Sequence, residues 1–402
     1  MATEVIQANK NWLKWARESA HYDKEEVAKK MKVKEDTLDN WEETGQIQYA
    51  QLIELSKIYR IAPHMFFNGK DPEPEEKPVD FRTIKNKKAE LTPDIVFELR
   101  NAKARRETLL DIEEEDEDFV IPDFKLKGYD VNTVDEAIEV INEVIRLNTV
   151  RRKKFSIDDW IAEVEKLGIL VFQFYKIKPS ELRGYAIYYD KLPIIGINHK
   201  ESDKAKKFTL FHELAHLLLK KEGLSNFYSL NIKDDTEVKC NAIAGEILIP
   251  SNVIRSEVEN KNIEDFTDEE LIKELSRRYK VSNEVIVRKF LNENFITKKE
   301  YEKFKEKLNK FIFEPSKTQH KRAPRVRKEL TPEEINENKI KNDMRIARRT
   351  ITENGDYYIN SLIYAYMNEI ITDLDFARNL DVSLRVVKFI IQIMIKEASN
   401  NG

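Results

Sequence analysis

One short motif, H-E-x-x-H, constrains this chain more than any other part of its sequence. It consists of His212, Glu213 and His216, within the run F-T-L-F-H-E-L-A-H-L-L-L that starts at Phe208. On a helix, residues four apart lie on one face, so both imidazoles can reach a single metal ion. Glu213 lies one position along the helix and can take a proton from water that the metal activates. The motif therefore predicts a metal-dependent hydrolytic site.

The predicted helix around this motif spans Lys204–Lys221 and is apolar almost all round, which is typical of a buried helix. Ser202 is the expected N-cap, and Lys220 and Lys221 suit the negative C-terminal end. A buried helix does not hold two histidines and a glutamate without partners, because unpaired polar groups cost free energy there. The alternative interpretation is two core histidines whose hydrogen bonds are satisfied within the protein.

A zinc peptidase site needs a third protein ligand and leaves a fourth position for water. The next predicted helix, residues 235–250, carries Glu237 on a face rich in small residues, which suits close packing against the metal helix. Glu246 is the competing ligand, but it lies on a different face of this helix. Cys240, the single cysteine, is expected to be a packing residue rather than a thiolate ligand. Glu237 is therefore the expected third ligand, with Glu246 as the alternative.

These two segments together resemble the ImmA/IrrE family of bacterial and phage metallopeptidases. The shared pattern is a strand ending in I-x-I-N, then H-E-x-x-H, then E-x-x-x-N before a proline. The first and last parts are here Ile195–Asn198 and the residues Glu237, Asn241 and Pro250. The resemblance covers roughly residues 78–292. It implies a zinc ion, with Mn²⁺ as the alternative metal, and a helix-turn-helix repressor or antitoxin as the protein substrate.

The resemblance also implies a role for each residue of the site. It makes His212, His216 and Glu237 the metal ligands. Glu213 is the catalytic residue, and Asn241 is a neighbouring amide. The sequence departs from the family pattern at Phe211 and Gly245, where alanine is usual. Neither departure removes a metal ligand.

Composition limits the remaining classes of protein. The 402 residues are 35% charged and 41% hydrophobic, which suits a soluble globular protein of two or three domains. No apolar run approaches the roughly 20 residues that span a bilayer, so no membrane partner is expected. A single cysteine fits a reducing compartment, and we expect a cytoplasmic protein. The net charge of −4 gives no overall signal of nucleic-acid binding.

Residues 1–70 are expected to form a helix-turn-helix domain. The segment E-E-V-A-K-K-M-K-V-K-E-D-T-L-D-N-W-E resembles the Xre family of repressor-like domains. Lys34, Thr37 and Asn40 are of residue types that contact base edges, so operator DNA is a candidate partner. The same helix carries five acidic residues, which oppose binding to phosphates: Glu35, Asp36, Asp39, Glu42 and Glu43. The sequence leaves two alternatives open, a DNA-binding domain or a domain that docks on a protein.

The whole chain is predicted to be mostly α, with a small sheet in an α+β central domain. A linker is expected at residues 71–91 and a zincin-like metallopeptidase domain at residues 92–296. Three strands precede the metal helix, at residues 169–175, 184–189 and 193–198. Residues 297–402 are predicted to be a helical regulatory or sensor module. It contains a basic run, Ser316–Lys328, and helix-turn-helix spacing again at Ile371–Ser383.

The sequence supports one main function and two alternatives. The main one is a zinc-dependent endopeptidase that cleaves a helix-turn-helix repressor or antitoxin, in a phage, stress-response or toxin–antitoxin setting. The alternatives are a DNA-binding regulator with a structural or sensory metal, and a toxin-like interaction protein. One further histidine, His199, follows the third strand. It is expected to be an exposed loop residue rather than a stabiliser of an oxyanion.

Overall fold

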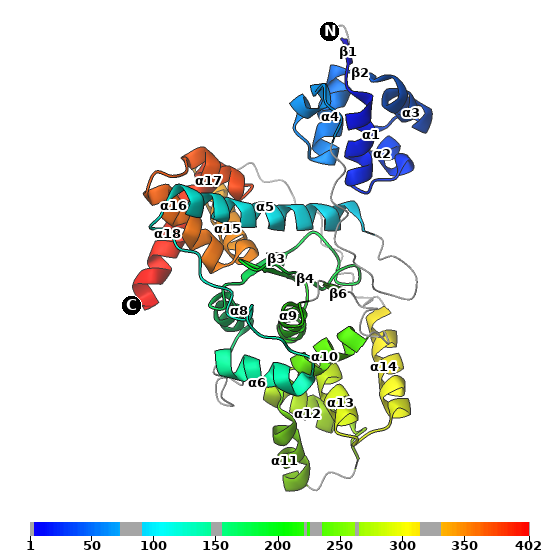
Figure 1. Cartoon of the computed structure of the whole chain (residues 1–402), viewed down its shortest axis with the longest axis vertical. Helices are drawn as coiled ribbons and strands as arrows, with labels where there is room; N and C mark the ends of the chain where they lie inside the picture. The colour runs from blue at the N-terminus through cyan, green and yellow to red at the C-terminus, as the bar shows by residue number, and fades with distance from the viewer. Residues whose placement is uncertain are drawn as a thin grey trace. The chain divides into compact units, whose positions relative to one another are not determined.

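The computed structural model describes residues 4–72, 91–145, 155–220, 223–225, 235–261, 265–313 and 331–401. Within these ranges the chain is mostly helical with two small sheets, which confirms the predicted fold class. It divides into two compact units, Met1–Lys103 and Ala104–Gly402 (Figure 1). Most of the expected linker and the basic run Ser316–Lys328 lie outside the described residues.

The first unit packs short helices around buried aromatic side chains. The helices are α1 (Lys10–Ser19), α2 (Lys24–Met31), α3 (Glu35–Thr44), α4 (Tyr49–Tyr59) and the 3-10 helix η1 (Pro63–Phe67). Trp12 and Trp41 are buried in its core, and Trp15 is half-buried against Trp12. Two three-residue strands that the sequence did not indicate, β1 (Val5–Gln7) and β2 (Gln46–Gln48), pair antiparallel.

A tight turn joins α2 to α3. Lys32 has a left-handed backbone with φ of 57°, and the N–H of Val33 donates to the carbonyl of Ala28 at 3.0 Å. This hydrogen bond ends α2 and lets α3 begin two residues later. The assignment of this unit to the Xre family stays a prediction.

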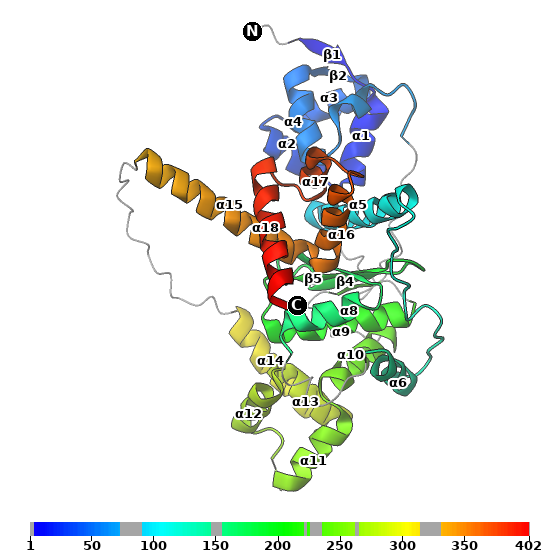
Figure 2. The ribbon, with the colours of Figure 1, turned by 90° about the vertical axis from the view of Figure 1, so that its left-hand side faces the viewer.

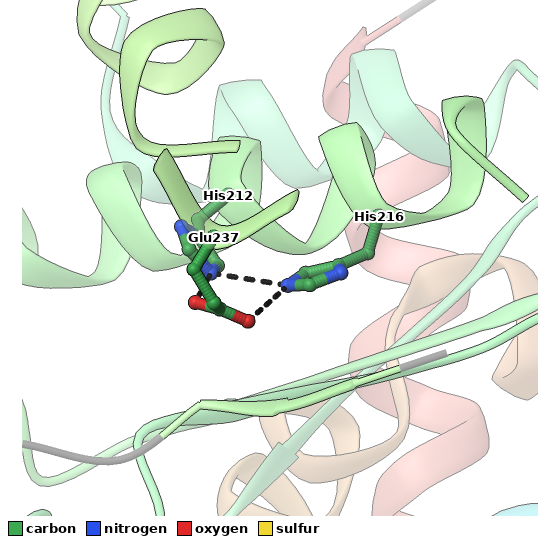
Figure 3. Close-up of side chains that lie close together, drawn as sticks. All are labelled: His212, His216 and Glu237. Atoms are coloured by element: carbon green, nitrogen blue, oxygen red, sulfur yellow. Dashed lines mark hydrogen bonds and ion pairs between the residues drawn. The ribbon is translucent and has the colours of Figure 1, made fainter. Parts of the chain in front are cut away.

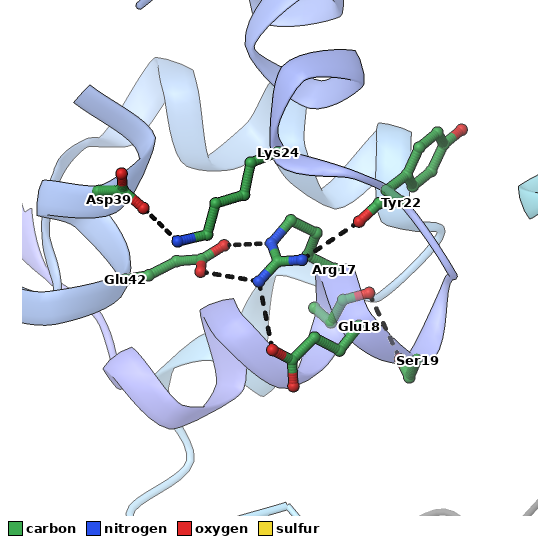
Figure 4. A network of polar contacts seen from close by, with 8 residues as sticks. Arg17, Glu18, Ser19, Tyr22, Lys24, Asp39 and Glu42 are labelled. Carbon is green, nitrogen blue, oxygen red and sulfur yellow. Dashed lines mark hydrogen bonds and ion pairs between the residues drawn. The ribbon is translucent and has the colours of Figure 1, made fainter. Parts of the chain in front are cut away.

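Two ion pairs connect α3 to the preceding helices (Figure 4). Arg17 of α1 is buried, and its Nε lies 2.7 Å from Oε1 of Glu42. Lys24 of α2 pairs with Asp39. Hydrogen bonding to Glu42 outweighs burial and raises the pKa of Arg17, so this pair stays charged. Two of the five acidic residues of α3 therefore have cationic partners inside the unit.

The second unit is built around a four-stranded sheet. Across the sheet, the strands are β3 (Leu170–Phe174), β5 (Ile194–Asn198), β4 (Gly184–Ile187) and β6 (Gly223–Ser225). β3 and β5 are parallel, and the other two pairs are antiparallel. The three longer strands confirm the sequence prediction, whereas β6 was not predicted.

Helices cover both faces of this sheet (Figures 1 and 2). On one face lie α8 (Ile157–Glu165) and α9 (Asp203–Leu218), which is the helix of the H-E-x-x-H motif. On the other face lie α15 (Pro332–Asn354) and α16 (Asp356–Met367). There Phe172 of β3 meets Tyr358 of α16 edge to face, with ring centroids 5.9 Å apart. Since both faces are covered, every residue of β3 and β5 is buried.

The remaining helices extend these two groups. α10 (Asp235–Leu248) packs along α9 and against α6 (Val134–Ile145). The chain continues through α11 (Ser251–Lys261), α12 (Glu269–Tyr279), α13 (Asn283–Asn292) and α14 (Lys298–Phe313). Near the C-terminus, α17 (Asp373–Asn379) and α18 (Leu384–Asn401) pack together, and α18 packs on α15. The helix α5 (Pro93–Glu115) runs from the first unit into the second. Among the described residues, no helix combines the length and the apolarity that crossing a membrane requires.

Candidate metal centre

Two helices bring three metal-binding side chains together (Figure 3). His212 and His216 lie one turn apart on α9, and Glu237 lies in the first turn of α10. The two Nε2 atoms are 3.2 Å apart. Oxygen atoms of Glu237 lie 3.3 Å from Nε2 of His212 and 3.2 Å from Nε2 of His216. The structure thus places the three side chains, all buried, around one point.

The spacing of these atoms fits a tetrahedral zinc site. Zn–N distances of about 2.0–2.1 Å and Zn–O distances of about 2.0–2.2 Å put neighbouring ligand atoms about 3.3–3.5 Å apart. Hydrogen bonding alone accounts for the arrangement less well, because a contact between two Nε2 atoms holds at most one proton. Among the described residues, moreover, Nδ1 of His212 and Nδ1 of His216 have no hydrogen-bond partner. These observations favour a metal site over two core histidines satisfied by the protein.

Electrostatics also favour a cation at this point. Burial opposes ionisation of Glu237, but hydrogen bonds from His212 and His216 outweigh it and hold the pKa of Glu237 at about 2. Burial lowers the pKa of His212, which therefore stays neutral at pH 7. Burial also acts to lower the pKa of His216, but hydrogen bonds to Cys240 and Glu237 prevail and raise it. The buried carboxylate thus requires a positive partner, for which a proton and a metal ion compete.

The carboxylate of Glu213 lies against strand β4. Glu213 is fully buried, on the helix that carries His212 and His216. A Cβ atom added at Gly184 would lie 2.7 Å from Oε1 of Glu213 and 2.5 Å from Cγ2 of Thr209. Both distances are too short for non-bonded atoms. Glycine at position 184 therefore leaves the space that the Glu213 carboxylate occupies.

An ion pair between half-buried Arg183 and buried Glu201 connects the start of β4 to the residues just before α9. Nε of Arg183, the residue before Gly184, lies 3.0 Å from Oε1 of Glu201. The hydroxyl of Thr209 donates to Oε2 of Glu201, also at 3.0 Å. Burial raises the pKa of Glu201, and the charge of Arg183 opposes that shift. Sequence reasoning missed these residues, because their partners are distant in sequence and no periodic pattern connects them.

The asparagine of the I-x-I-N motif orders the turn from β5 into α9. Asn198 is fully buried. Its Nδ2 donates to the carbonyls of Ile177 at 3.1 Å and Leu182 at 2.8 Å, and its Oδ1 accepts from the N–H of Lys200 at 3.0 Å. The N-cap Ser202, as predicted, accepts from the N–H of Ala205. Local hydrogen bonds thus fix where the metal helix begins.

The competing ligand Glu246 has other partners. Its carboxylate accepts from the N–H and the hydroxyl of Ser251, both at 2.7 Å, and pairs with Lys289. Cys240 is buried, and burial raises the pKa of its thiol, as suits a neutral packing residue. Asn241 is buried one turn after Glu237 on α10, but no hydrogen bond to its Oδ1 is found among the described residues.

His199 is held in contacts of its own, outside the converging group. Its Nδ1 lies 3.0 Å from Oε1 of Gln173, and its ring stacks on Tyr175 with centroids 4.0 Å apart. The side chain is half-buried rather than fully exposed. These contacts support packing where β3 and β5 end, and not the oxyanion interaction that the sequence left as an alternative.

The residues predicted to contact DNA lie on α3 in the first unit. Lys34 and Asn40 are exposed, and Thr37 is half-buried. Three carboxylates of this helix are also exposed: Glu35, Asp36 and Glu43. The exposed surface of α3 therefore carries more negative than positive charge, which opposes contact with a phosphate backbone.

Replacing Gly184 with alanine is expected to lower the rate of peptide cleavage about tenfold to a hundredfold, since a small displacement of a catalytic group has effects of this size. The added methyl group displaces Glu213 or Thr209 but touches none of the three converging ligands. Metal content, thermal midpoint and turnover of the two proteins provide the comparison. Gly245→Ala is the matched control, because its Cβ meets only Lys289 Cδ, at 3.7 Å. Equal turnover of Gly184→Ala and wild type would contradict the assigned role of this glycine.

Comparison with known families identifies the segment that holds this centre. Residues 164–291 match the peptidase M78 family model, described as the IrrE N-terminal-like domain. No curated protein and no solved structure gives a significant match. The matched range contains the sheet strands β3 to β5 and the helices α9 and α10, with the His-His-Glu group. The family implies a metal, typically zinc. The match to residues 164–291 and the His-His-Glu group within them therefore support a metallopeptidase domain of the ImmA/IrrE kind.

Proposed function

We propose that this chain is a zinc-dependent endopeptidase that cleaves a helix-turn-helix repressor or antitoxin and so relieves repression. The observation that carries the proposal is the spacing of His212, His216 and Glu237, which suits a tetrahedral metal, with Glu213 on the same helix. The substrate class, and a phage, stress-response or toxin–antitoxin setting, rest on the family resemblance. A cytoplasmic location belongs to the same proposal and is supported by the single, reduced cysteine.

The chemistry divides between the ion and the chain. A zinc ion held by His212, His216 and Glu237 would lower the pKa of water to about 7 and polarise the scissile carbonyl. Glu213 accepts the proton of the attacking water and, as a carboxylic acid, delivers it to the leaving amine. Because Glu213 is buried between α9 and β4, it exchanges this proton with the reacting groups rather than with bulk solvent.

Metal removal tests the proposal. The purified protein is expected to hold about one equivalent of zinc per chain, measurable by plasma mass spectrometry. Chelation should abolish cleavage of a helix-turn-helix repressor or antitoxin substrate, and added Zn²⁺ should restore it. Adding Mn²⁺ to the metal-free protein in a parallel experiment shows whether Mn²⁺ restores cleavage as well as Zn²⁺ does. Cleavage that persists in metal-free protein, or in His212→Ala, would refute the mechanism.

A further inference from the structure

The turn between α2 and α3 recurs at the end of the chain. Asp381 has a left-handed φ of 52°, and the N–H of Val382 donates to the carbonyl of Ala377 at 3.0 Å. Lys32, Val33 and Ala28 stand in the corresponding positions of the first unit, with the same hydrogen bond at 3.0 Å. In both places, a helix ending in this turn is followed at once by a second helix. α17 and α18 therefore form a helix-turn-helix, as the spacing of Ile371–Ser383 predicts.

The turn alone does not make a surface that reads nucleic acid. The same geometry joins α12 to α13, where Lys280 is left-handed and the N–H of Val281 donates to Ser276. There the second helix is part of the core, and Asn292 at its end is the one exposed residue of α13. α3 has an exposed face, but that face is mainly acidic. The same hydrogen bond also follows left-handed residues at other helix ends, namely His21, Arg60, Asn294 and Glu369. The turn is therefore a common way to end a helix, and the exposure and charge of the second helix are what distinguish α17–α18.

α18 has the exposed face and the charge that the other two helices lack. One side of the helix is buried in the second unit, through Val386, Val387, Ile390 and Met394. The opposite side exposes Leu384, Arg385, Lys388, Gln392, Ile395 and Lys396. From Leu384 to Lys396 the helix contains no acidic residue. Arginine, lysine and glutamine are the side chains that pair with guanine and adenine edges, and apolar side chains contact thymine methyl groups.

Further cations lie close to the start of α18. Arg378, on the first helix of the pair, is exposed. Asp343 of α15 lies 3.5 Å from Nε of Arg385, so the middle of α15 reaches the N-terminal end of α18. The exposed residues Lys341 and Arg345 lie two positions on either side of Asp343 in the sequence. Asp343 itself is buried, so the exposed charges between residues 341 and 345 are Arg345 and Lys341, which pairs with Glu337 at 3.4 Å.

We infer that α17–α18 is a binding site for duplex DNA, with the exposed face of α18 in the major groove. This site lies outside the family-matched range 164–291 and does not depend on the proposed peptidase chemistry. It assigns DNA contact to the C-terminal helices rather than to Lys34, Thr37 and Asn40 of α3. Arg385, Lys388 and Gln392 contact base edges or phosphates, and α15 supports the helix from behind.

Fluorescence anisotropy tests this inference. The whole chain is titrated into a labelled random-sequence duplex of about 30 base pairs, at salt concentrations from about 50 mM upwards. The wild type should bind with an affinity that falls as salt rises. Arg385→Glu with Lys388→Glu should weaken binding about tenfold to a hundredfold and reduce the log–log salt slope by about two. The milder pair Arg385→Gln and Lys388→Gln should weaken it about tenfold. This second pair keeps the test valid if the first fails to fold, as judged by circular dichroism.

A matched control separates a local site from net charge. Lys166→Glu with Lys178→Glu changes the net charge of the chain equally, at two exposed lysines of the second unit. This control and the pair Lys34→Ala with Asn40→Ala should bind as the wild type does. The inference fails if the lysine control loses as much affinity as the α18 variants, or if the α3 variant alone loses binding. It also fails if the wild type shows no salt-sensitive binding, or if RNA of equal length competes better than DNA.

Discussion

Glu213→Gln is expected to keep its metal and to cleave the proposed repressor substrate about 10²- to 10⁴-fold more slowly than the wild type. Glutamine has nearly the same shape, so it fits the space that Gly184 leaves beside Thr209. It cannot accept the proton of the attacking water, because an amide has no basic site near neutral pH. The three converging side chains are unchanged, so metal content and thermal midpoint should match those of the wild type.

The comparison requires a control for the loss of one carboxylate. Glu163→Gln removes a half-buried carboxylate of α8 that pairs with Lys166 at 2.8 Å, in the same unit. This variant should cleave at the wild-type rate. If Glu213→Gln cleaves as fast as the wild type while holding zinc, Glu213 is not the proton acceptor, and another group must be sought.

Glu165→Gln is expected to stabilise the second unit by up to about 5 kcal/mol at pH 9 and by little at pH 5. Glu165, at the end of α8, is buried, and burial together with the charge of Asp356 raises its pKa from 4.5 to about 8. Between pH 4.5 and about 8 the carboxyl of Glu165 is ionised in the unfolded chain and protonated in the folded chain. The wild type therefore loses stability as pH rises through this window, whereas glutamine stays neutral throughout.

Urea unfolding at pH 5, 7 and 9 measures this trend, and the difference between variant and wild type removes any shared effect of metal or of other groups. Asp356→Asn provides a second test, because removing that charge should lower the pKa of Glu165 and weaken the trend. Glu165 lies where α8 meets the start of α16, and a Cβ at Gly355 would lie 2.4 Å from its Oε1. A pH-independent difference between Glu165→Gln and wild type would show that Glu165 ionises normally.

The sequence predicted the parts of the site that follow a local period. The spacing of His212 and His216 places them on one helical face, and the face of α10 that carries Glu237 meets that helix. Arg183, Gly184 and Glu201 had no such signal. Each acts through a partner in another element, and local patterns do not contain that information.

The fold shows the same division between local and distant information. The three longer strands were predicted from their apolar sequences, and continuous apolar strands also indicate a sheet covered on both faces. The helices that cover the second face, α15 and α16, come from the end of the chain, which the sequence presented as a separate module. Likewise, the acidic residues Asp39 and Glu42 gave no sign of their partners on α1 and α2.

The late position of these covering helices has a consequence during synthesis. Roughly 180 residues separate the end of β3 at Phe174 from the start of α16 at Asp356, which takes about 10–40 s to translate. Throughout that interval Phe172 has Arg105 of α5, 4.9 Å from its ring centroid, but lacks its contact with Tyr358 of α16. The second face of this sheet is therefore completed only after α16 has been synthesised, long after the strands that it covers.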